Sequence, residues 1–349
     1  MMNNETNFMQ SSPAELGFSM PAEWAPHRAC WIAWPSDHWQ WRDLAEVEQA
    51  YANVANAIAE FEAVMMVADP SRGAAARQLC GTSVEVIEMP LDDSWMRDSG
   101  PSFVRHADSG AVAGTDWRFN CWGGAMAKYQ QDAQTANRVL DRLGMDAYHS
   151  SLVMEGGALH VDGEGTLVTT ESVVLNPNRN PGIDREQAEI ELCRATGARK
   201  VIWLPGDLNG DTTDMTDGHI DGIMCFIKPG VVLFERDSAA SGIYADLERE
   251  NRRALELTTD ARGRTLEIVD LVCDHAEIGH QDELFCSSYI NFYLPNNGLV
   301  MPSYGVAADE IVHDQLAGIF PGRKLVAVDL NAIAPGGGGI HCITQQQPA

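Results

Sequence analysis

The sequence predicts an α/β protein in which similar units are repeated around a ring. Four strand hairpins recur along the chain at steps of about 56 to 66 residues, and a helix and a buried strand follow each of them. The two ends of the chain supply the parts of one further unit. Such regular steps are typical of repeated supersecondary units rather than of unrelated hairpins.

Each predicted hairpin consists of two strand-like runs joined by a turn that contains glycine. The four runs are SFVRHADSGAVAGTDW, ALHVDGEGTLVTTESVV, IMCFIKPGVVLFERD and YINFYLPNNGLVMPSYG, which begin near residues 102, 158, 223 and 289. The following helices are expected within 127–144, 184–197, 244–257 and 308–322, because apolar residues recur there at spacings of three and four and the segments end near glycine. Buried strands are then expected within 145–153, 200–207, 266–272 and 324–330.

A fifth unit can be assembled from the two ends of the chain. Its strands are expected within 29–41 and 84–90, its helix within 43–61, and a last strand within 340–346. Pairing the last strand of a chain with its first unit is how propellers close their ring. The C-terminal residues are therefore expected to form a strand instead of fraying.

Composition indicates a globular protein, and although the length alone would suit two domains, the repeated plan favours one catalytic domain over residues 1–349, with residues 1–19 as a loosely ordered N-terminal segment. Of the 349 residues, 45% are hydrophobic and 21% are charged, with a net charge of −26. This charge disfavours nucleic acid and anionic membranes as partners, because both select a basic surface. The acidic residues either attract a cationic partner or serve solubility alone.

Cysteine usage and the N-terminus predict a reduced, cytoplasmic protein. The eight cysteines show no CxxC spacing and the chain has no HExxH motif, so a structural zinc site is not expected. The first residues lack a basic region followed by an apolar stretch, so no signal peptide is predicted. No apolar window is long enough for a membrane span.

Polar residues gather just before the hairpins, at equivalent places in the units. The clusters are DDSWMRDSGP at 92–101, MEGG at 154–157 and DMTDGHIDG at 214–222, and Cys342 follows a run of four glycines. Equivalent positions of a ring of units converge on one centre, so carboxylates, an imidazole and a thiol are expected to meet there. His219 and Asp221 are expected on the same side of an extended strand, because side chains alternate.

Each of these residues also has a plainer interpretation. Asp98 suits a surface or capping position, Glu155 a turn, and Cys342 a buried hydrophobic position. The pair His219 and Asp221 suits a buried histidine with its partner, or half of a metal site. Their joint placement at equivalent positions favours catalysis instead: a thiol with a histidine fits nucleophilic attack on an electron-poor carbon. Several carboxylates fit a guanidinium substrate, whose planar fork of donors they match.

These motifs resemble those of the agmatine deiminases, in the guanidine-modifying or pentein superfamily that includes bacterial-type peptidylarginine deiminases. The resemblance rests on DDSWMRDSGP, the segment from MEGG to NPNRNP, TDGHIDG and the terminal GGGGIHCITQQQP, with MPAEWAPH, WPSDHW and NCWGG in support. It covers the chain from about Met20 to the C-terminus. It implies a five-bladed α/β propeller of ββαβ repeats with a central funnel, no cofactor and no metal, and a homodimer as the family's usual assembly.

The resemblance also implies roles for individual residues. Cys342 would be the nucleophile and His219 the general acid and base, Asp98 and Asp221 would hold the guanidinium, and Glu155 would orient His219. The implied reaction converts agmatine and water to N-carbamoylputrescine and ammonia, a step of polyamine metabolism and putrescine biosynthesis.

Four further residues are candidates for contact with the substrate. Trp95 and Trp122 could form walls that pack against a cation or its methylene stem, or they could be ordinary core residues. Gly338 and Gly339, within the glycine run, would let the backbone approach the substrate closely. A merely flexible loop is the alternative for these glycines.

The sequence departs from the family pattern at three positions. Met215 stands where many agmatine deiminases have an acidic residue, and Gly222 and Gly339 stand where asparagine is frequent. Since the acidic residue would meet the far amine of agmatine, the partner of the substrate tail is left open. Asp211, Asp214 or Asp217 could supply it.

Two alternatives therefore stay open beside agmatine hydrolysis. One is deimination or amidino transfer on an arginine-like compound, whose carboxylate would need a basic partner among Arg97, Arg105, Arg118 and Arg179. The other is a protein that binds guanidinium compounds without catalysis.

Overall fold

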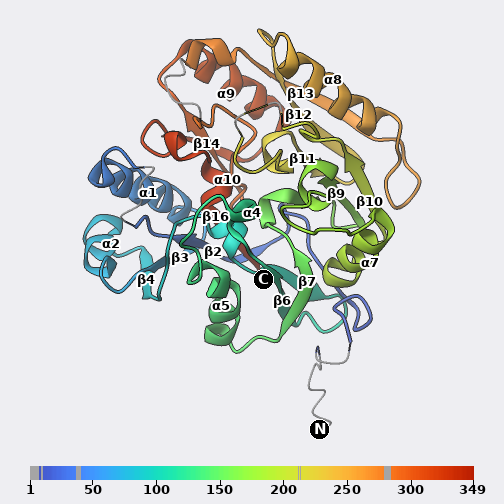
Figure 1. Cartoon of the computed structure of the whole chain (residues 1–349). Coiled ribbons are helices and arrows are strands. Elements are labelled where there is room, and N and C mark those ends of the chain that lie inside the picture. Colours follow the sequence, from blue (N-terminus) through green and yellow to red (C-terminus); the bar gives the residue numbers. More distant parts are fainter. Residues whose placement is uncertain (1–7, 9–10, 37–40, 211, 213, 279–283) are drawn as a thin grey trace.

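The computed structural model describes residue 8 and residues 11–36, 41–210, 212, 214–278 and 284–349. Within these ranges the strands group into five sheets, which lie around a common centre, and the longer helices lie at the periphery (Figure 1). Both the predicted α/β class and the repeated plan are confirmed.

Three sheets share one plan: an antiparallel hairpin, then a helix, then a strand parallel to the second strand of the hairpin. The first is β5 (Ser102–His106), β6 (Val112–Arg118), α5 (Thr135–Leu143) and β7 (Ala147–Val153). The second is β8 (Leu159–Val161), β9 (Thr166–Thr170), α7 (Arg185–Thr196) and β10 (Lys200–Leu204). The third is β11 (Met224–Lys228), β12 (Val231–Asp237), α8 (Ile243–Glu256) and β13 (Glu267–Cys273).

The fourth sheet is smaller than the sequence predicts. It contains β14 (Gly298–Ser303) and β15 (Lys324–Asp329), which are parallel and joined through α9 (Ala307–Ile319). The run that begins at residue 289 was expected to provide a full first strand. It provides only one antiparallel bridge, between Tyr293 and Val300.

The fifth sheet joins the two ends of the chain, as predicted. Strand β16 (Thr344–Pro348) pairs antiparallel with β2 (His27–Ala33). Strand β2 pairs in parallel with β3 (Ala63–Ala68) through α1 (Leu44–Ala59), and β3 pairs in parallel with β4 (Val84–Glu88) through α2 (Gly73–Cys80). The sequence prediction contained neither β3 nor α2. The C-terminus consequently lies near the centre of the ring (Figure 1).

Local sequence explains where the peripheral helices begin and end. Helix α7 starts at a capping box in which the side chain of Asp184 accepts from the backbone of Gln187 and the side chain of Gln187 bonds back to residue 184. It ends at Gly197, and α5 ends at Gly144, both with left-handed backbone geometry that glycine adopts without strain. These glycines bear out the expected helix ends.

The N-terminal segment is more ordered than expected over its second half. Residues Phe18–Ser19 form β1, which pairs antiparallel with β5, and Phe18 is buried. Backbone bonds within residues 12–18 fold the preceding stretch into turns. A loose segment over 1–19 is therefore wrong for residues 11–19, while residues 1–7, 9 and 10 lie outside the described residues.

In the described part of the chain, no helix combines the length and the apolar character needed to cross a bilayer.

Candidate active site

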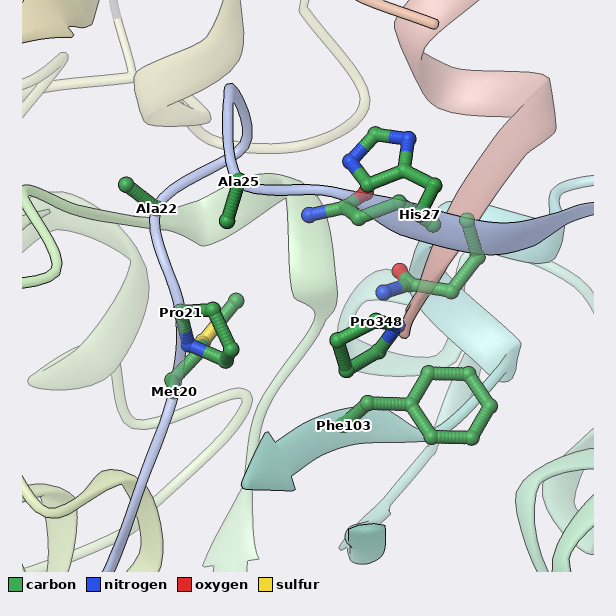
Figure 2. Close-up of a pocket in the computed structure, with 9 residues that line it drawn as sticks. Met20, Pro21, Ala22, Ala25, His27, Phe103 and Pro348 are labelled. Carbon is green, nitrogen blue, oxygen red and sulfur yellow. The ribbon is translucent and has the colours of Figure 1, made fainter. Parts of the chain in front are cut away.

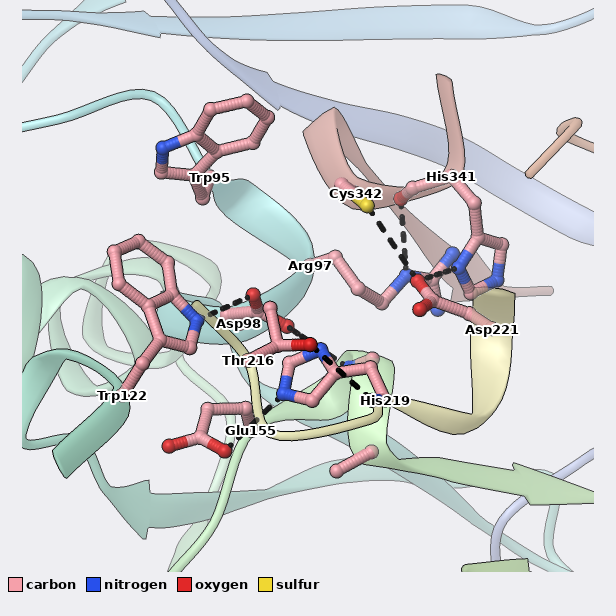
Figure 3. A network of polar contacts seen from close by, with 12 residues as sticks. Trp95, Arg97, Asp98, Trp122, Glu155, Thr216, His219, Asp221, His341 and Cys342 are labelled. Carbon is pink, nitrogen blue, oxygen red and sulfur yellow. Dashed lines mark hydrogen bonds and ion pairs between the residues drawn. The ribbon is translucent and has the colours of Figure 1, made fainter. Parts of the chain in front are cut away.

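The four polar clusters occupy the same place in their units. Each lies in or next to a single helical turn directly before the first strand of its sheet. The turns are α3 (Met96–Ser99), η2 (Gly156–Ala158), η3 (Ile220–Gly222) and α10 (Ile340–Ile343). Turn α3 packs on both α10 and η2, and η2 packs on η3. The structure therefore brings Asp98, Glu155, His219, Asp221 and Cys342 together (Figure 3), and α10, which carries Cys342, lies near the centre of the ring (Figure 1).

The local conformation differs from the prediction at two of these clusters. His219 and Asp221 are not on an extended strand, because residues 220–222 form a 3-10 turn with His219 at its start. Cys342 is likewise not in a strand: it lies in α10, and the strand begins only at Thr344. The hydroxyl of Thr344 donates to the carbonyls of Ile340 and His341, which holds this turn closed.

Both carboxylate oxygens of Asp98 accept a hydrogen bond. Its Oδ1 accepts the backbone N–H of Gly157 at 2.9 Å, and its Oδ2 accepts the indole N–H of Trp122 at 3.0 Å. Trp122 holds this position with a positive φ of 50°, a conformation uncommon outside glycine. Burial raises the pKa of Asp98, as do the nearby carboxylates of Asp221 and Glu155, while His219 opposes the rise.

His219 lies between two carboxylates. Its Nε2 is 3.2 Å from Oε2 of Glu155, and its Nδ1 is 3.8 Å from Oδ1 of Asp98. Burial lowers the pKa of the imidazole, but Asp98 and Glu155 outweigh burial and raise it to about 9. Glu155 is itself held by Arg179, whose Nε donates to its other oxygen at 3.0 Å. His219 is therefore an imidazolium at neutral pH, with Nε2 turned toward Glu155 and Nδ1 toward Asp98.

The thiol of Cys342 faces Asp221 and an asparagine that the sequence analysis did not identify. Its Sγ lies 3.7 Å from Oδ2 of Asp221, and the amide of Asn291 donates to the sulfur at 3.3 Å. The amide oxygen of Asn291 accepts the backbone N–H of both His341 and Cys342. Burial raises the pKa of the thiol well above its ordinary value, and the carboxylates of Asp221 and Asp98 add to this. The thiol is protonated when the site holds no cation.

Asp221 is supported by a buried charge network. His341 Nδ1 lies 2.8 Å from Asp221 Oδ2, and His341 Nε2 lies 2.7 Å from Oε1 of Glu23. Glu23 also meets the guanidinium of Arg97 at 3.4 Å. Although burial raises the pKa of Asp221, its bond to His341 lowers it below the ordinary range. Asp221 is therefore an ionised carboxylate next to the thiol.

Glu23, His160 and His341 are close enough together to be considered as metal ligands, but their hydrogen bonds do not fit that function. His160 Nδ1 accepts the backbone N–H of Phe226, so its Nε2 carries a proton and faces Glu23 at 3.5 Å. The guanidinium of Arg97 already supplies a positive charge to this cluster, 3.4 Å from Glu23. This cluster is an ion network rather than a metal site.

Gly157 lies directly against the side chains of His219, Asp98 and Asp221. A Cβ added to it would lie 2.6 Å from Nδ1 of His219, 2.9 Å from Oδ1 of Asp98 and 3.0 Å from Oδ2 of Asp221. The three side chains thus converge on the face of Gly157 that a side chain would occupy in any other residue. A small planar cation bound beside this glycine would meet two carboxylates at once.

The terminal glycines border the site through close contacts. A Cβ on Gly338 would lie 2.4 Å from the ring of Trp95 and 3.0 Å from Cβ of Cys342, and a Cβ on Gly339 would lie 2.4 Å from Oδ1 of Asn291. Trp95 is buried, with its ring 5.9 Å from that of Trp41. A side chain at either glycine would displace a ring or an amide, so packing against Trp95 and Asn291 requires glycine at both positions.

Met215 is one of the three departures from the family pattern, and the acidic residues beside it form hydrogen bonds and ion pairs that stabilise their own loop. Asp214 accepts from the backbone and hydroxyl of Thr216 and from the backbone of Gly218. Asp217 pairs with the guanidinium of Arg179. Asp211 lies outside the described residues. Asp214 and Asp217 are thus occupied in stabilising the loop that carries His219.

Several residues of this site were not singled out for it by the sequence analysis. They are Glu23, Gly157, Asn291 and His341, while Arg179 was considered only as a partner for a substrate carboxylate. Asn291 was missed because the sequence analysis placed it inside the first strand of the fourth hairpin, a strand that the structure does not form among the described residues. A separate pocket lined by residues including Met20, Phe103 and Pro348 contains none of the predicted residues (Figure 2). It therefore lies apart from the site.

Comparison with known proteins agrees with this architecture. The model of the Porphyromonas-type peptidyl-arginine deiminase family matches residues 19–348. The chain is 42% identical over 346 residues to a putative agmatine deiminase of Legionella pneumophila (97% of this chain and 98% of the relative), and 40% identical over 366 residues to the agmatine deiminase of Stutzerimonas stutzeri (98% of each). The structure of the Enterococcus faecalis agmatine deiminase superimposes with a TM-score of 0.91 at 34% identity, covering 97% of this chain and 98% of that one. The chain belongs to the agmatine deiminases, within the Porphyromonas-type peptidyl-arginine deiminase family.

Proposed function

We propose that this protein hydrolyses agmatine to N-carbamoylputrescine and ammonia through a covalent intermediate on Cys342. The observation that carries the proposal is the convergence on Gly157: two buried carboxylates and an imidazolium surround one point, with a thiol 3.7 Å from one of the carboxylates. The agmatine deiminases among its relatives supply the reaction and the substrate.

In the first half-reaction Asp98 and Asp221 hold the guanidinium over Gly157. The positive charge lowers the pKa of the Cys342 thiol, which releases its proton to solvent, and the thiolate attacks the central carbon to form a tetrahedral adduct. The imidazolium of His219 gives a proton to one amino group. That group leaves as ammonia, and an amidino thioether remains on Cys342.

In the second half-reaction the now neutral His219 takes a proton from water, which attacks the same carbon. Collapse of this adduct breaks the C–S bond, and the hydroxyl proton passes to the departing sulfur, which restores the Cys342 thiol and releases the neutral ureido product. Product release is favoured because the product no longer carries the charge that paired with the two carboxylates. General acid and base catalysis of this kind contributes roughly 10²–10⁴-fold to a rate.

The four arginines considered as partners for an arginine-like carboxylate do not favour that alternative. Arg97 pairs with Glu23, and Arg179 pairs with Glu155 and Asp217. Arg105 donates to the backbone carbonyl of the last residue, and Arg118 is exposed at the end of β6. The first two are buried in ion pairs, so using them to bind substrate would disrupt the site.

The test is a panel of guanidino compounds (agmatine, arginine and an alkylguanidine without the far amine) with ammonia and ureido product measured for each. Agmatine is expected to give both products, and the Cys342→Ala protein is expected to give neither. Faster turnover of arginine than of agmatine would reverse the substrate assignment. Activity that persists in Cys342→Ala would contradict the covalent mechanism.

We further propose that the five sheets form one catalytic domain, that the protein acts as a homodimer, and that it is located in the cytoplasm. All eight cysteines are free thiols, which suits a reducing compartment. Light scattering on the purified protein tests the dimer.

A further inference from the structure

A second cluster of potential ligands lies on the third sheet, outside the site described above. Glu235 is on β12, Cys273 ends β13, and His275 begins the 3-10 turn η4 (His275–Ile278). One donor atom from each of the three lies within 4.8 Å of the other two. The parallel pairing of β12 with β13, which sets Asp237 opposite Cys273, brings these residues together.

Two of the three donor separations fit a tetrahedral cation, and the third, between the sulfur and the ring nitrogen, is at most 4.8 Å. Cys273 Sγ is 3.6 Å and His275 Nε2 is 3.5 Å from the same oxygen, Oε1 of Glu235. Zinc binds sulfur at about 2.3 Å, imidazole nitrogen at about 2.0–2.1 Å and carboxylate oxygen at about 2.0–2.2 Å, so tetrahedral geometry places such ligands roughly 3.3–3.7 Å apart. Thiolate, imidazole and carboxylate are also the ligand types that zinc selects.

The surrounding hydrogen bonds orient two of the ligands. Nδ1 of His275 lies 3.3 Å from the hydroxyl of Ser287, a partner that leaves Nε2 with its lone pair when Nδ1 carries the proton. His275 Nε2 itself is buried without a hydrogen-bond partner. Ser288 donates to the second oxygen of Glu235, and the backbone N–H of Tyr289 donates to Oε1 at 2.7 Å, which fixes the carboxylate.

The charges nearby also favour a cation. Glu235, Asp237 and Asp274 all act on Cys273 and His275, and each of these groups is acidic. This differs from the Glu23 cluster, where Arg97 supplies a positive charge. A thiol activated by histidine is a weaker interpretation, because the sulfur donates to Glu235 Oε1 at 3.6 Å and the ring nitrogen lies 3.5 Å from the same oxygen.

We propose that Cys273, His275 and Glu235 bind one zinc-type divalent cation, with water in the fourth position. The side chain of His275 is 22% exposed and provides the route of entry. Binding replaces the thiol proton of Cys273 by the metal and releases that proton to solvent. The ion would join β12 and β13 to the segment 287–289, two residues before Asn291. The proposal does not depend on the deiminase reaction.

Cobalt(II) provides a direct test, because a bound thiolate gives it an intense charge-transfer absorption in the near ultraviolet. The titration uses the Cys342→Ala protein, so that the proposed nucleophile cannot bind the metal. We expect the absorption to saturate at one cobalt per chain, to disappear in Cys342→Ala with Cys273→Ser, and to persist in the matched control Cys342→Ala with Cys193→Ser. Added zinc should displace the cobalt.

The absence of this absorption in the Cys342→Ala protein would overturn the proposal, as would its persistence after Cys273→Ser. His275→Gln provides a second variant that changes a partly exposed residue and spares the core. Its zinc affinity, measured by competition with a chelating dye, should fall by at least about tenfold. An unchanged affinity would also overturn the site.

Discussion

The two ring nitrogens of His341 each face a carboxylate: Nδ1 lies 2.8 Å from Asp221 and Nε2 lies 2.7 Å from Glu23. This residue directly precedes the thiol-bearing Cys342, yet its ring points away from the substrate position and supports Asp221 from behind (Figure 3). A doubly protonated imidazole can donate to both carboxylates at once.

We expect His341→Gln to remove the charged hydrogen-bond partner that stabilises the ionised form of Asp221. Hydrogen bonds to charged groups contribute roughly 1.5–3 kcal/mol, so kcat/KM for agmatine should fall by about 10–100-fold. The pKa of Asp221 should rise, because its largest stabilising partner is lost, and the acidic limb of the kcat/KM profile should move to higher pH. A lower rate with an unshifted profile would indicate a merely structural effect.

Asn291 is expected to position the thiol through its amide group. Asn291→Asp keeps an oxygen for the backbone N–H groups of residues 341 and 342, but it removes the N–H that faces Sγ and adds a charge beside it. We expect kcat to fall by about 10–100-fold with a small change in KM. A loss confined to KM would instead place Asn291 in substrate binding.

Gly157→Ala should block the site without unfolding the protein, because the added methyl group would lie 2.6–3.0 Å from His219, Asp98 and Asp221. Gly222→Ala is the matched control: it lies one residue from Asp221, and nothing lies within 4 Å of the added Cβ. We expect the first variant to lose agmatine turnover and the second to keep it, with similar thermal unfolding for both. Comparable turnover in the two variants would show that no group occupies the space above Gly157.

The ionisation of Cys342 should depend on the substrate cation. Burial and the carboxylates of Asp221 and Asp98 raise the thiol pKa in the free protein. A guanidinium ion between these carboxylates offsets their charge and should lower that pKa. The shift in this thiol pKa can be measured from the thiolate absorbance of the wild type minus that of Cys342→Ala. The difference is followed against pH with and without guanidinium. Identical titrations would count against activation by the substrate.

His219 should make folding stability depend on pH on the alkaline side. Its pKa is about 9 in the folded protein against about 6.5 when unfolded, so its contribution is complete below about pH 6.5 and is lost as the pH rises through 9. The free energy of unfolding of the wild type minus that of His219→Gln should therefore shrink between pH 6 and pH 10. A difference that stays constant between these pH values would contradict the prediction.

The repeated plan of the fold could be predicted because it depends on local sequence signals. Glycine turns, periodic apolar residues and helix ends at Gly144 and Gly197 depend on neighbours within a few positions. Strand β3 and helix α2 were missed within 62–83, where a buried strand and a short helix follow one another without a hairpin turn to separate them. The fourth unit was overestimated because the apolar run at 289–294 favours a strand, whereas burial of the run accounts equally well for its composition.

By itself, the sequence determined the α/β class, the joining of the chain ends and the motifs that carry Asp98, Glu155, His219, Asp221 and Cys342, because those motifs recur before successive hairpins. Only the tertiary structure decided the helical turns that present these side chains, and the partners Glu23, Asn291 and His341 that hold them. Glu23 lies 318 positions from His341, and Asn291 lies 51 positions from Cys342. Contacts across such separations arise from the packing of whole units around the centre, so no local pattern of residues records them.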